Sequence, residues 1–466
     1  IPETSRLQSW FGVQDMTVGR PMDSLVRFSI PLLVGNLAQQ LYSTVDTIVV
    51  GKYVGDNALS AVGSSAPILN LMLALFVGVS TGAGIVVSQH YGAKDREALA
   101  QSIGNCITLA ALASLITMII GPLLTMPLLQ LLNTPESIIY WCRDYLVIFF
   151  VGAAGFTFYN ILSGILRGLG DSLSALMFLI VATILNIFLD IWFVAKFRMG
   201  VAGVSLATVI AQLISAGCCY WKLIRMTDVF RLRGQDLKLN KACALRIIRV
   251  GVPSGITQAI FSVSMLVVQT LTNSLGEMVI ACNVIVMRVD GFAMMPNMTF
   301  GNAMSVYAGQ NVGAGKLKRV EDGTKQGMLL ATATSAVITL LLVFLGHNLM
   351  RLFTQTEALI DLSARMLRIL AVGYIAMAVS QVLGGVMRGA GDTVTPMWLS
   401  LISTVVLRLP LAYGMTYLTR APETPHGKPE ALFGSMLITW VLGAVMHYIA
   451  FRSGIWKKKL PGKDTL

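Results

Sequence analysis

Three acidic side chains lie inside long apolar stretches of the sequence, where a charged group is costly. They are Asp46, Asp190 and Asp290, and the first two each precede a lysine, Lys52 or Lys196, by six residues. If both stretches are helices that end near those lysines, a rise of about 1.5 Å per residue puts both carboxylates at one depth, roughly 9 Å from the helix end. Two carboxylates at one depth in apolar surroundings could bind a cation or a proton.

Two further polar side chains are expected at this depth. Asn186 precedes Asp190 by four residues, which places both on one face of a helix, and Thr208 lies seven residues into the next apolar stretch. Carboxylate, carboxamide and hydroxyl oxygens suit a hard cation that has lost its water. The candidate cation-binding and coupling set, with Na⁺ as the metal, is therefore Asp46, Asn186, Asp190 and Thr208. A buried structural hydrogen-bond network is the alternative.

The chemistry of this set does not decide between two ions. Neighbouring carboxylates in a poorly hydrated pocket titrate as a pair, so the site could accept either Na⁺ or protons, and no other cofactor is expected. Pro31 lies fifteen residues before Asp46, and a proline permits a helix to kink. We hypothesise that ion occupancy changes the bend there, with a static proline kink as the alternative.

The segments that contain these residues are apolar, and so is the chain as a whole. Of the 466 residues, 55% are hydrophobic and 12% charged, and the mean hydropathy is +0.71, whereas soluble domains have roughly 25% charged residues. This excludes a water-soluble domain. Six scattered cysteines without a CxxC pair exclude a disulfide-stapled module, and the placement of the basic residues excludes a nucleic-acid binder. A polytopic membrane protein remains.

Twelve apolar stretches are long enough to cross a bilayer as helices. Their uninterrupted hydrophobicity favours helices over a membrane β-barrel. Of the 35 basic residues, 24 lie in the terminal tails and in alternate loops or within four residues of them, so both termini are expected in the cytoplasm. The stretches lie near residues 25–50, 58–88, 99–131, 140–165, 173–195, 201–224, 246–272, 279–310, 327–352, 360–386, 394–418 and 431–451.

The sequence also repeats itself. The tract RGLGD at Arg167–Asp171 recurs as RGAGD at Arg388–Asp392, an offset of 221 that also maps Gln89 onto Gln310. We predict two six-helix lobes, 20–225 and 246–455, joined by a basic cytoplasmic linker at 226–245. Parallel repeats of this kind occur in transporters that bind substrate between the halves. The two RGxGD tracts are interpreted as tight turns whose aspartate caps the next helix.

The repeat provides an internal comparison for the acids. At offsets of 221 or 222, Asp46 corresponds to Val267 or Val268, and Asp190 to Leu411 or Ala412. Asn186 corresponds in the same way to Leu407 or Arg408. The second half therefore has no acids at these positions. This indicates that the first half does not need Asp46 and Asp190 in order to fold.

Several tracts together resemble the multidrug and toxic compound extrusion (MATE) family of cation-coupled antiporters. They are DTIVVGKYVGDNALSAVG (Asp46–Gly63), QHYGA, QNVGA, both RGxGD turns and NIFLD (Asn186–Asp190), within a resemblance covering roughly residues 20–455. The resemblance implies an all-α, two-lobe, V-shaped transporter of twelve transmembrane helices that exports organic cations against inward Na⁺ or H⁺. Asp46, Asn186, Asp190 and Thr208 match its N-lobe cation site. The resemblance also allows a second arrangement, in which an acidic residue on the seventh helix binds the cation. The seventh helix of this sequence contains no acid over Gly251–Gln269, so that site is expected to be absent.

The remaining predictions concern the second half and the cellular setting. Gln39, Asp290, Met294, Met295 and Met298 are possible substrate-cavity residues, since methionines are flexible and polarizable; charge pairing of Asp290 with Arg408 and plain methionine packing are the alternatives. We expect a monomer in the bacterial inner membrane, contacting lipids and small organic cations, with no nucleic-acid partner and no enzymatic activity. A flippase for lipid-linked oligosaccharides is the alternative transport function.

Overall fold

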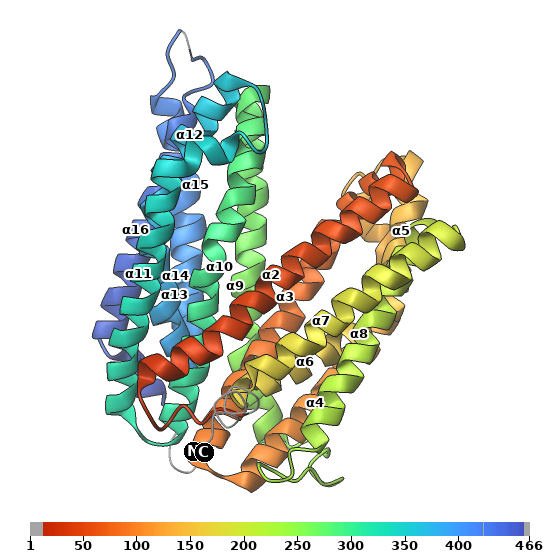
Figure 1. The fold of residues 1–466 in the computed structure, drawn as a ribbon, viewed down its shortest axis with the longest axis vertical. Coiled ribbons are helices and arrows are strands. Elements are labelled where there is room, and N and C mark those ends of the chain that lie inside the picture. The colour runs from red at the N-terminus through yellow and green to blue at the C-terminus, as the bar shows by residue number, and fades with distance from the viewer. Residues whose placement is uncertain (1–12, 423, 461–466) are drawn as a thin grey trace, which may run out of the picture. The chain divides into compact units, whose positions relative to one another are not determined.

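The computed structural model describes residues 13–422 and 424–460, except the side chains of residues 42, 43, 45–47, 56 and 75. The described chain is almost entirely helical (Figure 1). In chain order the elements are α2 (Pro21–Tyr53), α3 (Asp56–Ala93), α4 (Arg96–Leu131), α5 (Glu136–Val151), α6 (Ala153–Gly168), α7 (Ser172–Asp190), the π-helix η1 (Ile191–Lys196), α8 (Gly200–Ile224), α9 (Lys241–Ser274), α10 (Glu277–Gly313), α11 (Leu317–Met350), α12 (Glu357–Ala371), α13 (Gly373–Gly389), α14 (Val394–Leu401), the π-helix η2 (Ile402–Leu407), α15 (Arg408–Leu418), α16 (Pro429–Arg452) and the 3₁₀-helix η3 (Ile455–Lys459).

These elements confirm the twelve helical segments expected from the sequence. Among the described residues, nine helical stretches are long and apolar enough to cross a membrane, and two bent pairs, α5 with α6 and α12 with α13, raise the number to eleven. The 33-residue α2 is a further long helix. Each predicted apolar stretch coincides with one helix or with consecutive helices, except that the stretch 327–352 extends two residues beyond the end of α11 at Met350. The chain is therefore a multi-pass membrane protein.

The chain forms two compact units, which we describe separately. Unit 1 contains residues 27–255 and unit 2 contains residues 16–26 and 256–465, apart from the extreme ends of the chain. Two helices are divided between the units: α2 passes from unit 2 to unit 1 after Val26, and α9 passes from unit 1 to unit 2 after Gly255.

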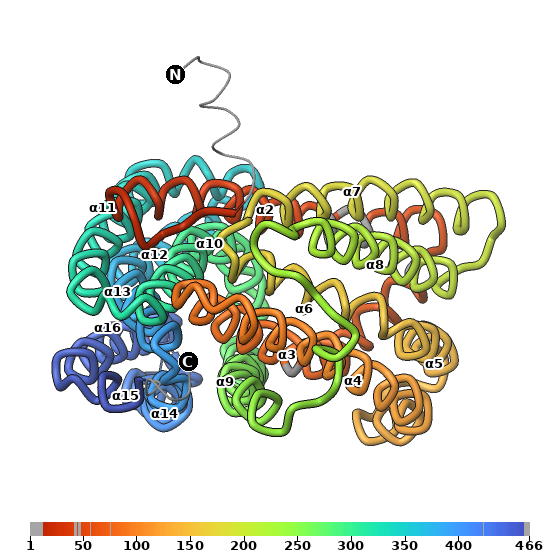
Figure 2. Tube along the Cα trace, turned by 90° about the horizontal axis from the view of Figure 1, so that it is seen from below, coloured from red at the N-terminus to blue at the C-terminus, as the bar shows by residue number. Residues whose placement is uncertain are grey.

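Unit 1 is a bundle in which α3, α6 and α8 pack in sequence against one another, with α4 and α5 on one side and α7 against α8. The last pair lies side by side in both views (Figures 1 and 2). Small residues permit a close approach of two helices, because a Cβ on Gly82 of α3 would lie only 2.6 Å from the Cα of Gly251 in α9. Aliphatic side chains of α3, α4, α6 and α8 fill the core.

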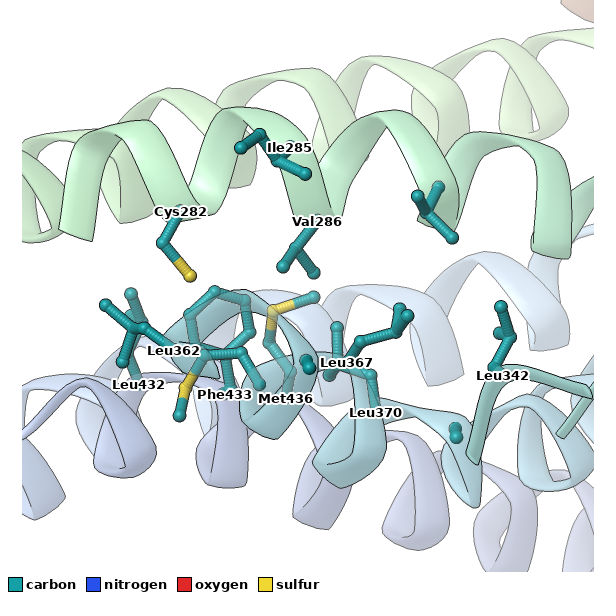
Figure 3. Close-up of a cluster of buried hydrophobic side chains, with 14 of the residues drawn as sticks. Cys282, Ile285, Val286, Leu342, Leu362, Leu367, Leu370, Leu432, Phe433 and Met436 are labelled. Carbon is teal, nitrogen blue, oxygen red and sulfur yellow. The ribbon is translucent and has the colours of Figure 1, made fainter. Parts of the chain in front are cut away.

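Unit 2 is built around the packing of α10 on α13, with α11, α12 and α16 also in contact with α13. Its core contains aliphatic and aromatic side chains of α10, α12 and α16, among them Val286, Leu367 and Phe433 (Figure 3). Burying such side chains against other helices positions α9, α10, α15 and α16 around the polar residues described below.

Local structure agrees with the internal repeat. Both units contain one long segment that is bent near its middle, by 53° between α5 and α6 and by 41° between α12 and α13. Both RGxGD tracts make the predicted turns, with positive φ at Gly170 and Gly391. Each following aspartate caps the next helix: Asp171 accepts a hydrogen bond from the Ser174 amide at 2.9 Å, and Asp392 accepts one from the Thr395 amide at 3.1 Å.

Candidate functional site

Three of the four predicted cation-site residues lie on two adjacent antiparallel helices of unit 1. Asn186 and Asp190 are on α7, and Thr208 is on α8, which packs against α7. Asn186 and Asp190 have no exposed surface, and Thr208 is 9% exposed. The four-residue spacing places Asn186 and Asp190 on one face of α7, and this face is buried.

One hydrogen bond joins α7 and α8 at this position. The Asn186 amide nitrogen donates to the Thr208 hydroxyl oxygen at 3.3 Å, and that hydroxyl donates to the Val204 carbonyl at 3.1 Å. Asp190 ends α7, and the chain continues directly into the π-helix η1. Such wider turns are frequent at functional sites, and this one was not predicted from the sequence.

The fourth residue, Asp46, belongs to α2, but its side chain lies outside the described residues. Pro31 lies inside the same helix and is buried, and α2 is assigned as one helix through it. Gln39 is exposed. The structure thus brings Asn186 and Thr208 into contact, buries Asp190 one turn along α7, and leaves the contribution of Asp46 a prediction.

Unit 2 contains a second polar cluster, around Asp290 of α10. The Tyr374 hydroxyl of α13 donates a hydrogen bond to Asp290 Oδ1 at 3.0 Å, and the Tyr374 ring packs on Trp440 with centroids 5.8 Å apart. Arg408 interacts electrostatically with Asp290, but no ion pair of 4.0 Å or less joins these two described side chains. Sequence reasoning considered Arg408 as the partner and did not single out Tyr374, because nothing in its spacing relates it to Asp290.

The three methionines near Asp290 differ in their surroundings. Met295 is 9% exposed, Met294 packs partly buried against the core of unit 2, and Met298 is 47% exposed. Their role in a substrate cavity, like that of Gln39 and Asp290, stays a prediction.

A cavity of about 190 Å³ lies within unit 2 and was not predicted from the sequence. Its walls come from α9, α10, α15 and α16, and different methionines contribute to them. The lining residues are Met265, Leu266, Val268, Gln269, Asn283, Met287, Arg408, Leu432 and Met436.

A second, wide cavity of about 620 Å³ opens at the start of α11, also in unit 2. It is lined mainly by basic residues, and its lining includes Pro21, the first residue of α2. The basic residues are Lys316, Lys318, Arg319 and Lys325.

Comparison with known proteins gives a family match that occurs twice. The sequence model of the MatE family matches residues 31–192 and again residues 253–414. The starts and the ends of the two matches are both 222 residues apart, which supports the duplication independently of the motifs quoted above.

Whole-length relatives and solved structures agree with this match. The chain is 27% identical over 445 residues to the probable multidrug resistance protein YoeA of Bacillus subtilis, covering 94% of each chain. It is 31% identical over 401 residues to YpnP of the same organism, covering 85% of this chain and 88% of that one. A structure described as the outward-facing conformation of a multidrug resistance MATE family transporter has a TM-score of 0.88 at 22% identity, covering 96% of this chain and 99% of that one.

Proposed function

The chain belongs to the MatE family of multidrug efflux transporters, and from this premise we propose that it is a secondary active exporter. In this proposal it moves organic, mostly cationic, compounds out of the cell in exchange for inward Na⁺ or H⁺. Family members handle small molecules, and the relatives named above are described as multidrug resistance proteins.

The observation that carries the proposal is the buried polar group shared by α7 and α8. Asn186 bonds to Thr208 across the two helices at 3.3 Å, and Asp190 is fully buried one turn further along α7. A carboxylate in a membrane interior is a functional hypothesis by default, because inserting it costs at least about 2.5–3.5 kcal/mol. Together with Asp46, these oxygens would hold Na⁺ or share a proton.

Coupling requires that the ion favour one conformation of the protein over another. The cation would draw Asp46 of α2 towards α7 and α8, and Pro31 is the position in α2 that permits a change of bend. A bound ion would thereby alter the face that α2 presents to cargo.

The cellular setting that we propose is the bacterial inner membrane, with both termini in the cytoplasm and the protein working as a monomer without enzymatic activity. The orientation is supported by the basic cavity at the start of α11, since it places Pro21 of α2 beside Lys316 and Lys318. Basic residues collect on the cytoplasmic side of membrane proteins.

The test is dye efflux in proteoliposomes under separate Na⁺ and H⁺ gradients. We expect one gradient to drive export, and Asp190→Asn and Asp46→Asn to lower the gradient-driven rate at least about ten-fold, within the usual range of coupling energies. Asp144→Asn removes an acid of α5 that is exposed and pairs with Arg143, so this control should retain the wild-type rate.

Two outcomes would contradict the proposal. Export that persists under a gradient in both Asp46→Asn and Asp190→Asn would exclude the coupling site. Export that responds to ATP and to neither ion gradient would exclude secondary active transport.

A further inference from the structure

The cavity within unit 2 contains a buried arginine. Arg408 begins α15 directly after the π-helix η2 and is 6% exposed. Its Nε has no hydrogen-bond partner in the described part of the chain. Burying a guanidinium without a hydrogen-bonded partner is strongly unfavourable, so a ligand that supplies acceptors would stabilise it.

The nearest acid does not fill this role. Asp290 acts on Arg408 electrostatically, but its carboxylate accepts the hydrogen bond of Tyr374 at 3.0 Å. The two side chains are not within ion-pair distance. Asp290 also does not line the cavity, whereas Arg408 does.

The cavity occupies the position in unit 2 that corresponds to the candidate cation site of unit 1. In the register of the two family matches, 222 residues apart, Val268 corresponds to Asp46 and Arg408 to Asn186. Both Val268 and Arg408 line the cavity. An acid has been replaced by an apolar residue and a neutral amide by a cation, which reverses the sign of charge at this position.

The remaining correspondence within the matched residues does not restore a negative charge inside the cavity. Asp190 corresponds to Ala412, which is buried in the core of unit 2.

The remaining walls suit an amphipathic ligand. The Asn283 amide donates to the Gln269 carbonyl oxygen at 3.3 Å, and carboxamide nitrogens can also donate to an anion. Met265, Met287 and Met436 provide flexible apolar walls. The volume of about 190 Å³ equals that of about six water molecules and is smaller than the roughly 300 Å³ or more of drug-sized sites. The cavity therefore has room for one substituent of a drug-sized ligand.

We propose that this cavity is an anion subsite that binds the carboxylate of amphipathic, zwitterionic cargo, with Arg408 as its main ligand. A guanidinium and a carboxylate match as a two-bond pair, which adds specificity as well as affinity. The proposal rests on the proposed function only in that the ligand is cargo. It assigns recognition of the carboxylate of such cargo to unit 2.

The test measures equilibrium binding, so it does not depend on transport. The full-length protein in vesicles of phosphatidylethanolamine and phosphatidylglycerol is titrated with a zwitterionic xanthene dye that carries a free carboxylate and, separately, with the methyl ester of that dye. We expect the wild type to bind the free acid about ten-fold more tightly than the ester, as is typical for a charge-assisted hydrogen bond. In Arg408→Gln this ratio should fall to about one.

A matched control removes the same charge nearby. Arg288 is exposed on α10, two residues from Asp290, and Arg288→Gln should retain the wild-type ratio. If Arg408→Gln does not fold, Val268→Asp decides instead, because an acid in the cavity should abolish the preference for the free acid.

Equal binding of the two dyes by the wild type would overturn the proposal, as would a ratio that is unchanged in the folded Arg408→Gln or Val268→Asp protein. Failure of ion-driven export with the binding ratio intact would instead count against the proposed function alone.

Discussion

At the scale of single residues, the Asn186–Thr208 hydrogen bond separates a role in ion binding from a role in folding. Thr208→Val removes the hydroxyl that accepts from Asn186. We expect the ion concentration for half-maximal transport to rise about three- to ten-fold, because a buried hydrogen bond typically contributes about 0.5–1.5 kcal/mol. The measurement is dye export against a series of Na⁺ concentrations and of pH values.

The same helix offers a matched control for this variant. Ser205 of α8 is fully buried and donates to the Tyr145 carbonyl at 2.8 Å, so Ser205→Ala also removes a buried hydroxyl. Both variants should lower thermal stability to a similar extent, but only Thr208→Val should change the ion dependence. An equal change of ion dependence in both variants would assign Thr208 a purely structural role.

Sequence reasoning reached some residues of the sites and missed others for a physical reason. The contact between Asn186 and Thr208 was predictable because depth along two antiparallel helices follows from residue counts. Tyr374 and the cavity around Arg408 were not predictable. They depend on which faces of α10, α13 and α15 meet, and those faces are set by packing between helices that are distant in sequence.

At the scale of helices, Pro31 is the position where we expect α2 to respond to the ion. Pro31 has no amide hydrogen to donate to the Arg27 carbonyl, so Pro31→Ala would permit that hydrogen bond and stiffen the helix. We expect gradient-driven export to fall by a factor of about five or more, equivalent to about 1 kcal/mol. The measurement is the proteoliposome assay described above.

Pro253 is the control, since it lies 222 residues after Pro31 and inside α9. Pro253→Ala should leave the ion dependence of export unchanged, because no acid of α9 takes part in the candidate site. Wild-type export and ion dependence in Pro31→Ala would show that the proline kink is static.

The elements themselves were largely predictable from the sequence. Twelve apolar stretches correspond to twelve helical segments because hydrophobic length is imposed by the bilayer. The bends near Gly152 and Val372 and the two π-helices were missed. The chain is helical and apolar on both sides of each bend and each π-helix. The hydropathy of the sequence therefore does not reveal where they lie.

At the scale of the molecule, the segment before α2 is held on unit 2 by Arg319 of α11. The Arg319 guanidinium donates to the carbonyls of Val18 and Gly19, each at 2.8 Å, and to that of Met16 at 3.1 Å. The Met16 amide donates to Gln310 Oε1 at 2.9 Å. The beginning of α2 is therefore fixed to unit 2 before the helix continues into unit 1.

We expect Arg319→Met to loosen this segment. Loss of these charged hydrogen bonds removes on the order of 1–3 kcal/mol of local stability, so hydrogen exchange of the Met16 amide should become at least about five-fold faster. Mass spectrometry of a peptide spanning residues 13–22, in which the Met16 nitrogen remains an amide, measures it. Lys318→Met, which removes an exposed charge from the same turn, should leave exchange unchanged; equal acceleration in both variants would mean that Arg319 does not hold the segment.

The division of α2 and α9 between the units also bears on ancestry. Cutting the chain in the basic linker would not release two self-sufficient bodies, since the first fragment would keep Met16–Val26, which packs with unit 2, and the second would keep Lys241–Gly255, which packs with unit 1. A precursor with a single repeat would consequently have assembled as a dimer of two identical copies. The first turns of one helix of each copy would have packed in the other copy, as in a domain-swapped dimer.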